Sequence, residues 1–515
     1  MTRSLLQKRT RTKPVERRQG PEDGHGAGRL DRDLGLFTLT MIGVGATIGT
    51  GIFFTMVEAV PKAGPSVILS FLIAAMTAGL TARCYAELAA RIPASGSSYS
   101  FAYATVGEFA AFVMAACLLL EYGLAASATA IGWSAYLNNF LENGVHWEIP
   151  SALRMPMIVS GPQGVEFHPG QFNLPPVLLV SLCGAMLIRG TKESATTNAV
   201  MVLIKLCILV FFAVIAFSGF DSKNFSPFFN PDHSKGYGGM VGVTAAAGTV
   251  FFSFIGLDTV ACAGEEVQNP RRNVPVGILA ALAIVTVFYL LVAVAAIGAQ
   301  PAGKFQGQEA GLAVILQTVT GHAWPAIVLS AGAVISVFSV TLVTLFGQTR
   351  ILYAISCDGL IPTVFRKIDA RTHTPVRNTV IVCSVVGVVA GLVDSEFLWD
   401  MVSMGTLTAF SVVSIAVPVL RRKQGGSSEG GFRVPFGPYV VPGLSVAACL
   451  FIMKDLSVTT LRVFAIWMSF AIVSYLLYGL RNSRLNFESA ADERPKGVAQ
   501  NESSPRIVAQ DGRPG

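Results

Sequence analysis

Three ionisable side chains lie inside long apolar stretches of this 515-residue chain, where a charge is costly. Lys205 follows Val202-Leu203-Ile204, Glu121 follows three leucines, and Asp258 follows Ser-Phe-Ile-Gly-Leu. Each end of the stretch around Lys205 is roughly 15 Å away if it is helical. Its ammonium must therefore face the interior of a helix bundle or lose its proton. Such groups are typical of proton relays and of sites for ionic solutes in membranes.

A glycine-rich run, residues 43–53, lies inside the first long apolar stretch. Glycine disfavours helix, and irregular backbone at membrane depth is tolerated only where it is buried in protein or lines a cavity. The run therefore predicts a broken transmembrane helix with exposed backbone donors and acceptors, which hold small polar solutes in transporters. The alternative is close helix packing through Gly45 and Gly49, which are four residues apart.

A second interruption lies in the sixth apolar stretch, from Ser253 to Gly256, and Asp258 follows it. Five spans separate the two interruptions, and an odd number reverses the chain direction. The two halves would then be inverted repeats, and paired interrupted helices indicate a transport site. For Asp258, the alternative role is the N-cap of the second half-helix.

Composition places the chain in a membrane. It is 52% hydrophobic and 13% charged, whereas soluble domains carry about 25% charged residues. Its basic residues lie in the N-terminal tail and in alternate loops, which favours the positive-inside rule over a nucleic-acid surface. The first 33 residues are polar and basic, so we expect no cleaved signal peptide. The cysteines and histidines form no metal or catalytic cluster, so we expect no metal, no cofactor and no enzyme.

About twelve apolar spans follow from length and from Gly, Pro and charge punctuation. Their approximate limits are 34–58, 65–91, 107–135, 173–190, 195–219, 239–264, 275–299, 325–356, 378–394, 397–420, 440–456 and 459–480. A short helix or a re-entrant segment is expected at 92–99 on the inner side, and a short helix at 309–320 on the outer side.

Loop charges set the orientation. The inner loops are rich in basic residues, and the outer loops hold Lys62, Arg154, Lys223, Lys235, Lys304 and Lys454. The asymmetry predicts that both termini are cytoplasmic. We expect disordered cytoplasmic tails at 1–33 and 481–515, a first repeat at 34–219, a second repeat at 239–420 and two further helices at 440–480.

Several long motifs resemble one transporter superfamily. The run 45–53, Gly-Ala-Thr-Ile-Gly-Thr-Gly-Ile-Phe, resembles the first-helix motif of the amino acid–polyamine–organocation (APC) superfamily. Residues 251–258 with 265–272 resemble the sixth helix and following loop of its cationic amino acid transporter branch. Residues 120–122, 132–136 and 347–362 also match this branch, so the resemblance covers spans 1–10 well and the last two loosely. It implies an all-α membrane protein with a LeuT-type fold, a 5+5 inverted repeat with broken helices 1 and 6.

The resemblance and the chemistry of an α-amino acid together suggest a site. Unpaired N–H groups at residues 48–51, at the start of a half-helix, suit a carboxylate. Unpaired carbonyls near the second break suit the ammonium, and Phe252 matches an aromatic gating position. Side chains of the eighth span, Ser336 and Val337, are expected to face the substrate side chain. The expected substrate-binding residues are Thr47, Ile48, Gly49, Thr50, Gly51, Glu121, Phe252, Ser253, Ile255 and Val337.

Coupling and gating are expected at charged groups. In proton-coupled relatives a lysine at the position of Lys205 approaches the broken first helix, which implies proton rather than sodium coupling. The alternative is a permanently charged structural lysine, and Glu121 could equally be a protonated, hydrogen-bonded carboxyl. The gating residues expected are Phe252, Asp258, Glu265 and Arg271, and inner ion pairs could also involve Arg83, Glu87, Glu266 and Arg272. Alternatively, these inner residues are ordinary solvated charges.

The expected function is secondary active transport of an amino acid across the cell (plasma or inner) membrane. We expect proton-coupled symport of cationic or small neutral L-amino acids by alternating access. The alternatives are an amino acid/amine exchanger without net proton coupling and an amino acid sensor that does not transport. Expected partners are the amino acid, protons and the lipid bilayer, with no nucleic acid. The sequence does not indicate an oligomeric state.

Overall fold

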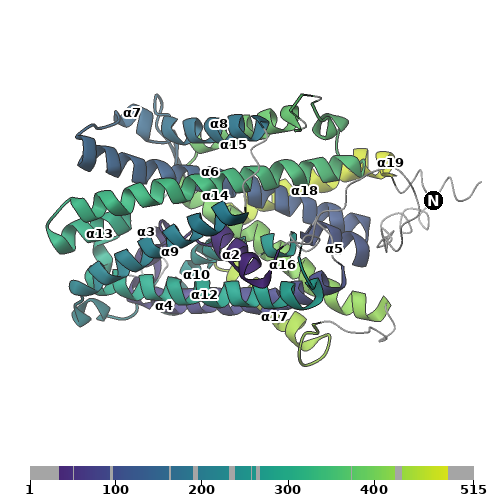
Figure 1. The fold of residues 1–515 in the computed structure, drawn as a ribbon, viewed down its shortest axis with the longest axis horizontal. Helices are drawn as coiled ribbons and strands as arrows, with labels where there is room; N and C mark the ends of the chain where they lie inside the picture. Colours follow the sequence, from purple (N-terminus) through teal and green to yellow (C-terminus); the bar gives the residue numbers. More distant parts are fainter. Residues whose placement is uncertain are drawn as a thin grey trace, which may run out of the picture.

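The computed structural model describes residues 34–49, 51–92, 97–161, 164–189, 195–230, 238–256, 258–262, 267–369, 371–372, 374–423 and 432–484. These residues are mostly helical (Figure 1). Eight helical segments within them are long and apolar enough to cross a membrane. The chain is therefore a multi-pass integral membrane protein.

Both predicted interruptions are present. The first apolar stretch forms α2 (Leu36–Thr47) and α3 (Thr55–Ala63), with irregular backbone between them. The sixth forms α10 (Gly239–Phe251), the 3-10 turn η3 (Phe252–Phe254) and the short helix α11 (Thr259–Cys262). In each case the helix ends where the sequence supplies glycine and small polar residues.

The remaining helices follow the predicted spans, except that the third span, predicted as 107–135, continues as a helix to Val145. They are α4 (Val67–Arg91), α6 (Glu108–Val145), α8 (Leu174–Arg189), α9 (Ala195–Ser218), α12 (Pro270–Ala299), α14 (Trp324–Cys357), α15 (Val376–Leu392), α16 (Ser395–Lys423), α17 (Val440–Met453) and α18 (Val458–Ser474). The last continues into the π-helix η7 (Tyr475–Gly479) and α19 (Leu480–Asn482). Because α8, α15 and α17 have 16, 17 and 14 residues, they are shorter than the ~20 residues of a full span. The total of twelve spans stays a prediction.

Two long helices form the centre of the bundle. Helices α6 and α14 have 38 and 34 residues and pack along each other (Figure 1). The predicted outer helix is confirmed as α13 (Gly311–Thr320), and α5 (Ser97–Thr105) lies between the second and third spans. Figure 1 shows α13 and the short helix α7 (Ser151–Arg154) at one end of the bundle, with α5 and α19 at the other. Which of these ends is the outer side of the membrane stays a prediction.

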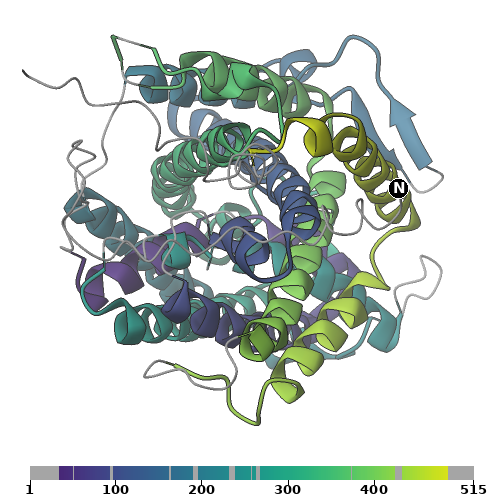
Figure 2. The ribbon, with the colours of Figure 1, turned by 90° about the vertical axis from the view of Figure 1, so that its right-hand side faces the viewer.

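A β-hairpin was not expected from the sequence. Strands β1 (Ile158–Gly161) and β2 (Gly164–Phe167) pair antiparallel after the end of α6. The hairpin lies at the rim of the bundle when the helices are viewed nearly end-on (Figure 2). Its first residue accepts a hydrogen bond at 2.9 Å from the N–H of Asp394, in the short link between α15 and α16. The hairpin is thus bonded to the short link between the ninth and tenth predicted spans.

The 3-10 turns η1 (Gly64–Ser66), η2 (Ser222–Phe225), η5 (Ala302–Lys304) and η6 (Thr363–Arg366) complete the described elements. The principal hydrophobic core gathers residues from α2, α3, α4, α6, α10, α12, α14 and α16. It surrounds both interruptions, so the irregular backbone is enclosed in protein. That enclosure is the condition under which broken helices are tolerated at membrane depth.

Candidate functional site at the two helix breaks

The two breaks lie against each other. A Cβ added at Gly51 would overlap the Cα and Oγ of Ser253, so the first break contacts the second through bare backbone. In the reverse direction, Gly256 has φ +103° and its hypothetical Cβ would lie 2.8 Å from the main-chain oxygen of Ala46. Only glycine fits such approaches without a shift of backbone. The glycines therefore permit a direct junction between two segments about 200 positions apart in the sequence.

One buried tyrosine joins the two breaks. Tyr289 of α12 places its hydroxyl 2.8 Å from the main-chain oxygen of Thr47 and 2.7 Å from that of Ser253. Ser253 is also linked to the first break through its side chain, since its Oγ lies 3.1 Å from Oγ1 of Thr55. Carbonyls at interrupted helix ends need donors when buried. Tyr289 supplies one donor that both carbonyls share.

Lys205 is buried in α9 beside the first break. Its Nζ donates to the main-chain oxygen of Gly45 at 3.2 Å. A Cβ added at Gly49 would lie 3.4 Å from the same nitrogen and only 2.6 Å from Cγ2 of Val340 on α14. The predicted approach of this lysine to the broken first helix is confirmed. Its role in proton coupling stays a prediction.

Some backbone groups expected to be unpaired already have partners. The N–H of Ile48 donates to Val44 at 2.7 Å and caps α2. The carbonyl of Phe252 accepts from the N–H of Ile255 at 3.2 Å, and that of Ser253 accepts from Tyr289. These details of the sequence interpretation were wrong, because each break satisfies part of its own backbone in a tight turn. Thr50 lies outside the described residues.

Glu121 and Asp258 form a buried acidic pair on the side of the breaks toward α11. Tyr122 donates its hydroxyl to Oδ2 of Asp258 at 3.1 Å. The carboxyl of Glu121 is within hydrogen-bonding range of Thr406 and interacts electrostatically with Asp258. Both side chains are buried. The bond from Tyr122 joins Asp258 at the start of α11 to α6, so Asp258 makes a contact besides any cap of that short helix.

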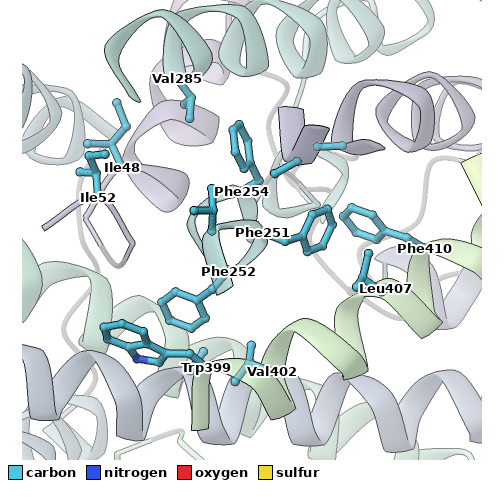
Figure 3. Packing of buried hydrophobic residues seen from close by; sticks show 14 of the residues in the cluster. Ile48, Ile52, Phe251, Phe252, Phe254, Val285, Trp399, Val402, Leu407 and Phe410 are labelled. Carbon is cyan, nitrogen blue, oxygen red and sulfur yellow. The ribbon is translucent and has the colours of Figure 1, made fainter. Parts of the chain in front are cut away.

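Three phenylalanines of the second break point in three directions (Figure 3). Phe251 packs edge-on against Phe410 with ring centroids 5.6 Å apart, and Phe254 packs against Tyr289 at 5.3 Å. Phe252, the expected aromatic gate, stacks on Trp399 of α16 at 5.8 Å with ring planes 20° apart. The break is thus held by α12 and α16, and its gate position has an aromatic partner that the sequence interpretation did not include.

The eighth span contributes a buried hydroxyl near the first break. Ser336 is 2% exposed, and its Oγ has no hydrogen-bond partner among the described residues. It lies one helical turn from Val340, whose side chain approaches Gly49. Val337, the predicted substrate contact, is buried beside it. An unsatisfied buried hydroxyl is costly, so Ser336 is a candidate to hydrogen-bond a bound solute.

A family comparison decides what kind of protein carries this site. The model of the amino acid permease family matches residues 34–480. The chain belongs to this family. The match includes both breaks, Lys205 and the acidic pair, and it ends in the described final helices. This permease is accordingly a membrane transporter rather than an enzyme.

Relatives of the permease are similar over most of its length. The methylthioribose transporter of Bacillus subtilis is 41% identical over 459 residues, which cover 89% of this chain and 95% of the relative. The branched-chain amino acid permease BcaP of the same organism is 38% identical with the same coverage of both chains. The vacuolar cationic amino acid transporter 2 of Arabidopsis thaliana is 34% identical over 80% of this chain and 62% of its own.

The end of α3 belongs to a polar cluster that the sequence interpretation missed. Lys62 was assigned to an outer loop, but it lies in the last turn of α3 and is buried. Its Nζ donates to Oγ1 of Thr249 at 3.1 Å, and that hydroxyl donates to Oδ1 of Asp400 at 3.4 Å. Thr249 is three residues before Phe252, and Asp400 follows Trp399. The cluster and the aromatic stack therefore connect the same two helices.

The inner charges pair differently from the expected gate. Glu87 accepts from Arg421 at 2.7 Å and 2.6 Å, and it also pairs with Arg91 at 3.0 Å. Arg83 instead donates to the carbonyl of Gly79 at 3.1 Å. Arg271 is exposed at the start of α12, while Glu265 and Glu266 lie outside the described residues. Glu87 therefore joins α4 to α16, and the gating roles of Glu265 and Arg271 stay predictions.

Three of these residues carried only weak signals in the sequence. Tyr289 carries one hydroxyl in an apolar helix. Trp399 lies just after the short link between two predicted spans, and Asp400 lies in the second turn of its helix. Asp400 gave the clearest signal, because a carboxylate inside an apolar span needs a partner. Its partners come from α3 and α10, and the sequence around Asp400 does not identify them.

Proposed function

We propose that the permease is a proton-coupled symporter of an L-amino acid that works by alternating access, with a LeuT-type 5+5 arrangement. The junction of the two breaks supports this proposal, because Ala46 meets Gly256 while Gly51 meets Ser253. Equivalent interrupted helices that meet near the middle of a bundle are typical of transporters built from inverted repeats. The repeats are then 34–219 and 239–420, with 440–480 as peripheral helices.

The substrate main chain binds at the junction in this proposal. The carboxylate lies at the residues that precede α3, around Gly49, Thr50 and Gly51, because a helix N-terminus attracts anions. The ammonium lies toward the second break, near Ile255 and the acidic pair. The stacked rings of Phe252 and Trp399 close the outer side of the substrate site. The remaining contacts in this proposal are made by Thr47, Ile48, Ser253, Glu121 and Val337.

The contact between Lys205 and Gly45 carries the proton-coupling part of the proposal. A charged ammonium makes a strong hydrogen bond to the carbonyl at 3.2 Å. When the lysine loses its proton, that charge-assisted bond is lost and the end of α2 at the first break is less firmly held against α9. Protonation and the position of α2 are thereby linked. A lysine that is buried inside a helix bundle is suited to such reversible protonation.

Transport into proteoliposomes with an imposed pH gradient tests the proposal. We expect uptake of a labelled amino acid to rise when the outside is acidic and to collapse when the gradient is dissipated. If uptake does not depend on the pH gradient but requires unlabelled amino acid inside the proteoliposomes, the permease is an exchanger instead. Saturable binding without uptake in either condition would show a sensor.

The substrate class is proposed as cationic or small neutral. Apolar walls at Phe252, Trp399 and Val337 favour a neutral side chain, while the acidic pair Glu121 and Asp258 could receive a cationic one. The relatives named for branched-chain and for cationic amino acids represent both chemistries. A competition panel of unlabelled leucine, alanine, lysine and arginine against one labelled substrate distinguishes them. If only lysine and arginine inhibit uptake, the side chain of the substrate binds at the acidic pair.

The proposed location is the plasma or inner membrane with both termini cytoplasmic. The basic residues of alternate loops support this orientation. Reporter fusions at either end test it. A cytoplasm-active reporter should work at both termini, and activity of a periplasmic reporter at either would reverse the topology.

A further inference from the structure

The segment 432–439, which leads into α17, exposes large aromatic side chains. Phe436 is 79% exposed and Tyr439 is 55% exposed. Phe436 also has φ +59°, a conformation that is unfavourable for a non-glycine residue. Such backbone persists where the surrounding structure imposes it, and it is a sign of function. The residues that follow along α17, Val440 and Leu444, are also exposed and apolar.

Basic side chains surround these aromatic residues. Arg422 and Lys423 end α16, and Arg433 is exposed in the segment itself. The guanidinium of Arg422 lies 5.7 Å from the ring centroid of Tyr439, and its Nε donates to the tyrosine hydroxyl at 3.1 Å. Arg433 is close enough to Arg91 for electrostatic repulsion. Within the described part of this surface, the basic residues outnumber the acidic ones.

The segment is firmly attached to the bundle through one buried residue. The N–H of Val434 donates to Oε2 of Glu87 at 2.7 Å, and its carbonyl accepts from Arg421 at 3.2 Å. Val434 is 3% exposed, while the residues on either side of it are exposed. The ion pair between α4 and α16 therefore holds the segment so that Arg433 and Phe436 point outward.

We propose that segment 432–439, together with the end of α16, binds the headgroup of an anionic phospholipid. Arg422, Lys423 and Arg433 contact the phosphate, and Phe436 and Tyr439 lie at the boundary between headgroup and acyl chains. Aromatic rings are enriched at that depth, and basic clusters beside a span select anionic lipids. The site lies on the cytoplasmic side in the predicted topology.

Lipid binding at this surface affects the bundle through Glu87. The lipid holds the segment, the segment holds Val434, and Val434 is bonded to the carboxylate that joins α4 to α16. A bound anionic lipid therefore stabilises the contact between these two helices. The proposal does not depend on which solute the permease carries.

Thermal unfolding of the purified permease in detergent tests the site. Phosphatidylglycerol is titrated in, with phosphatidylcholine as the zwitterionic comparison. We expect phosphatidylglycerol to raise the unfolding midpoint of the wild type. Each basic residue contributes about 1 kcal/mol near an anionic surface, so R422Q/K423Q/R433Q should need at least about tenfold more of this lipid.

The matched control removes the same charge from another exposed inner surface, with R366Q/K367Q/R371Q. We expect this variant to respond to phosphatidylglycerol like the wild type. Equal midpoints without lipid will show that both triple variants fold. An unchanged response of R422Q/K423Q/R433Q, or an equal response of the wild type to phosphatidylcholine, would overturn the proposal.

Two further measurements separate a lipid from a soluble anion. Inorganic phosphate should leave the midpoint unchanged, because it lacks the apolar part that Phe436 contacts. Phe436→Ser should weaken the response to phosphatidylglycerol by roughly threefold while all basic residues remain. If phosphate alone reproduces the shift and Phe436→Ser has no effect, the surface binds soluble anions and not lipid.

Discussion

The hydroxyl of Tyr289 lies 2.7 Å from the main-chain oxygen of Ser253, and the same hydroxyl is 2.8 Å from the oxygen of Thr47. A single side chain of α12 thus bonds to both interrupted helices. The two carbonyls belong to different breaks, and a residue of a third helix holds them close together.

Tyr289→Phe should slow transport strongly. The change removes one hydroxyl and leaves two buried carbonyls without it, at a cost of about 1–3 kcal/mol. We expect the maximal uptake rate to fall about tenfold or more. Uptake kinetics in proteoliposomes measure the effect, and Tyr136→Phe is the control, since that hydroxyl donates to Phe53 at 2.8 Å and bonds to only one break. Equal losses in both variants would show that the bridge has no special role.

Lys205→Ala should preserve the fold and abolish the pH dependence of uptake. The substitution removes the donor that approaches Gly45, so the position of α2 no longer follows protonation. Uptake measured from pH 5 to pH 8 should become flat. Lys454→Ala is the control, because Lys454 is exposed just after α17, and this variant should keep the wild-type pH profile. A variant of Lys205 with unchanged pH dependence would remove the argument for proton coupling.

Ser336→Ala should raise the KM of uptake with little effect on stability. The Oγ of Ser336 has no hydrogen-bond partner within the described structure, so its loss breaks no protein contact. Ser330→Ala on the same helix is the matched control, because its Oγ lies 2.9 Å from Asn139. We expect that control to lower the unfolding midpoint and to leave KM unchanged. The reverse pattern would exclude Ser336 from the binding site.

Glu87→Gln should destabilise the permease markedly. The buried carboxylate binds Arg421, Arg91 and the N–H of Val434, and breaking a buried ion pair costs about 3–5 kcal/mol. Unfolding by heat or denaturant measures the loss. Glu309→Gln, which weakens the exposed pair with Arg154 at 3.5 Å, should change stability by less than about 1 kcal/mol. Similar costs for both would mean that Glu87 is solvated in the native protein.

Lys62→Met and Asp400→Asn should show energetic coupling. Both residues bond to Thr249 in the polar cluster, and residues in one network give non-additive effects of about 0.5–3 kcal/mol. We expect each single variant to be destabilised and the double variant to lose less than their sum. The pair of the exposed Lys454 with the half-buried Asp455, at 3.6 Å, provides the comparison and should be closer to additive. Strict additivity for Lys62 and Asp400 would exclude a shared network.

The sequence predicted the breaks because glycine acts locally. Helix α2 continues through Gly43 and Gly45, but the run 43–53 still marks where it ends. Gly51 and Gly256 are the places where the two breaks approach each other's backbone. Lys205 could also be placed, since a lysine in a long apolar helix must face polar groups. Its partner Gly45 lies in the motif that the sequence had already singled out.

The pairings between distant helices could not be predicted in the same way. Lys62 was taken for a loop residue because Pro61 and Gly64 resemble punctuation, yet α3 continues through this proline. The partners of Glu87 lie more than 300 residues away in the chain. Such contacts depend on which helices are neighbours, and span counting supplies only their order.

The three phenylalanines of the second break also restrict which insertions and deletions this permease can tolerate. Phe251, Phe252 and Phe254 contact Phe410, Trp399 and Tyr289 respectively. Adding or removing one residue between them would turn at least one of the three rings away from its partner. Variants with a new substrate range should therefore keep the length of this turn and carry substitutions on α14 and α16.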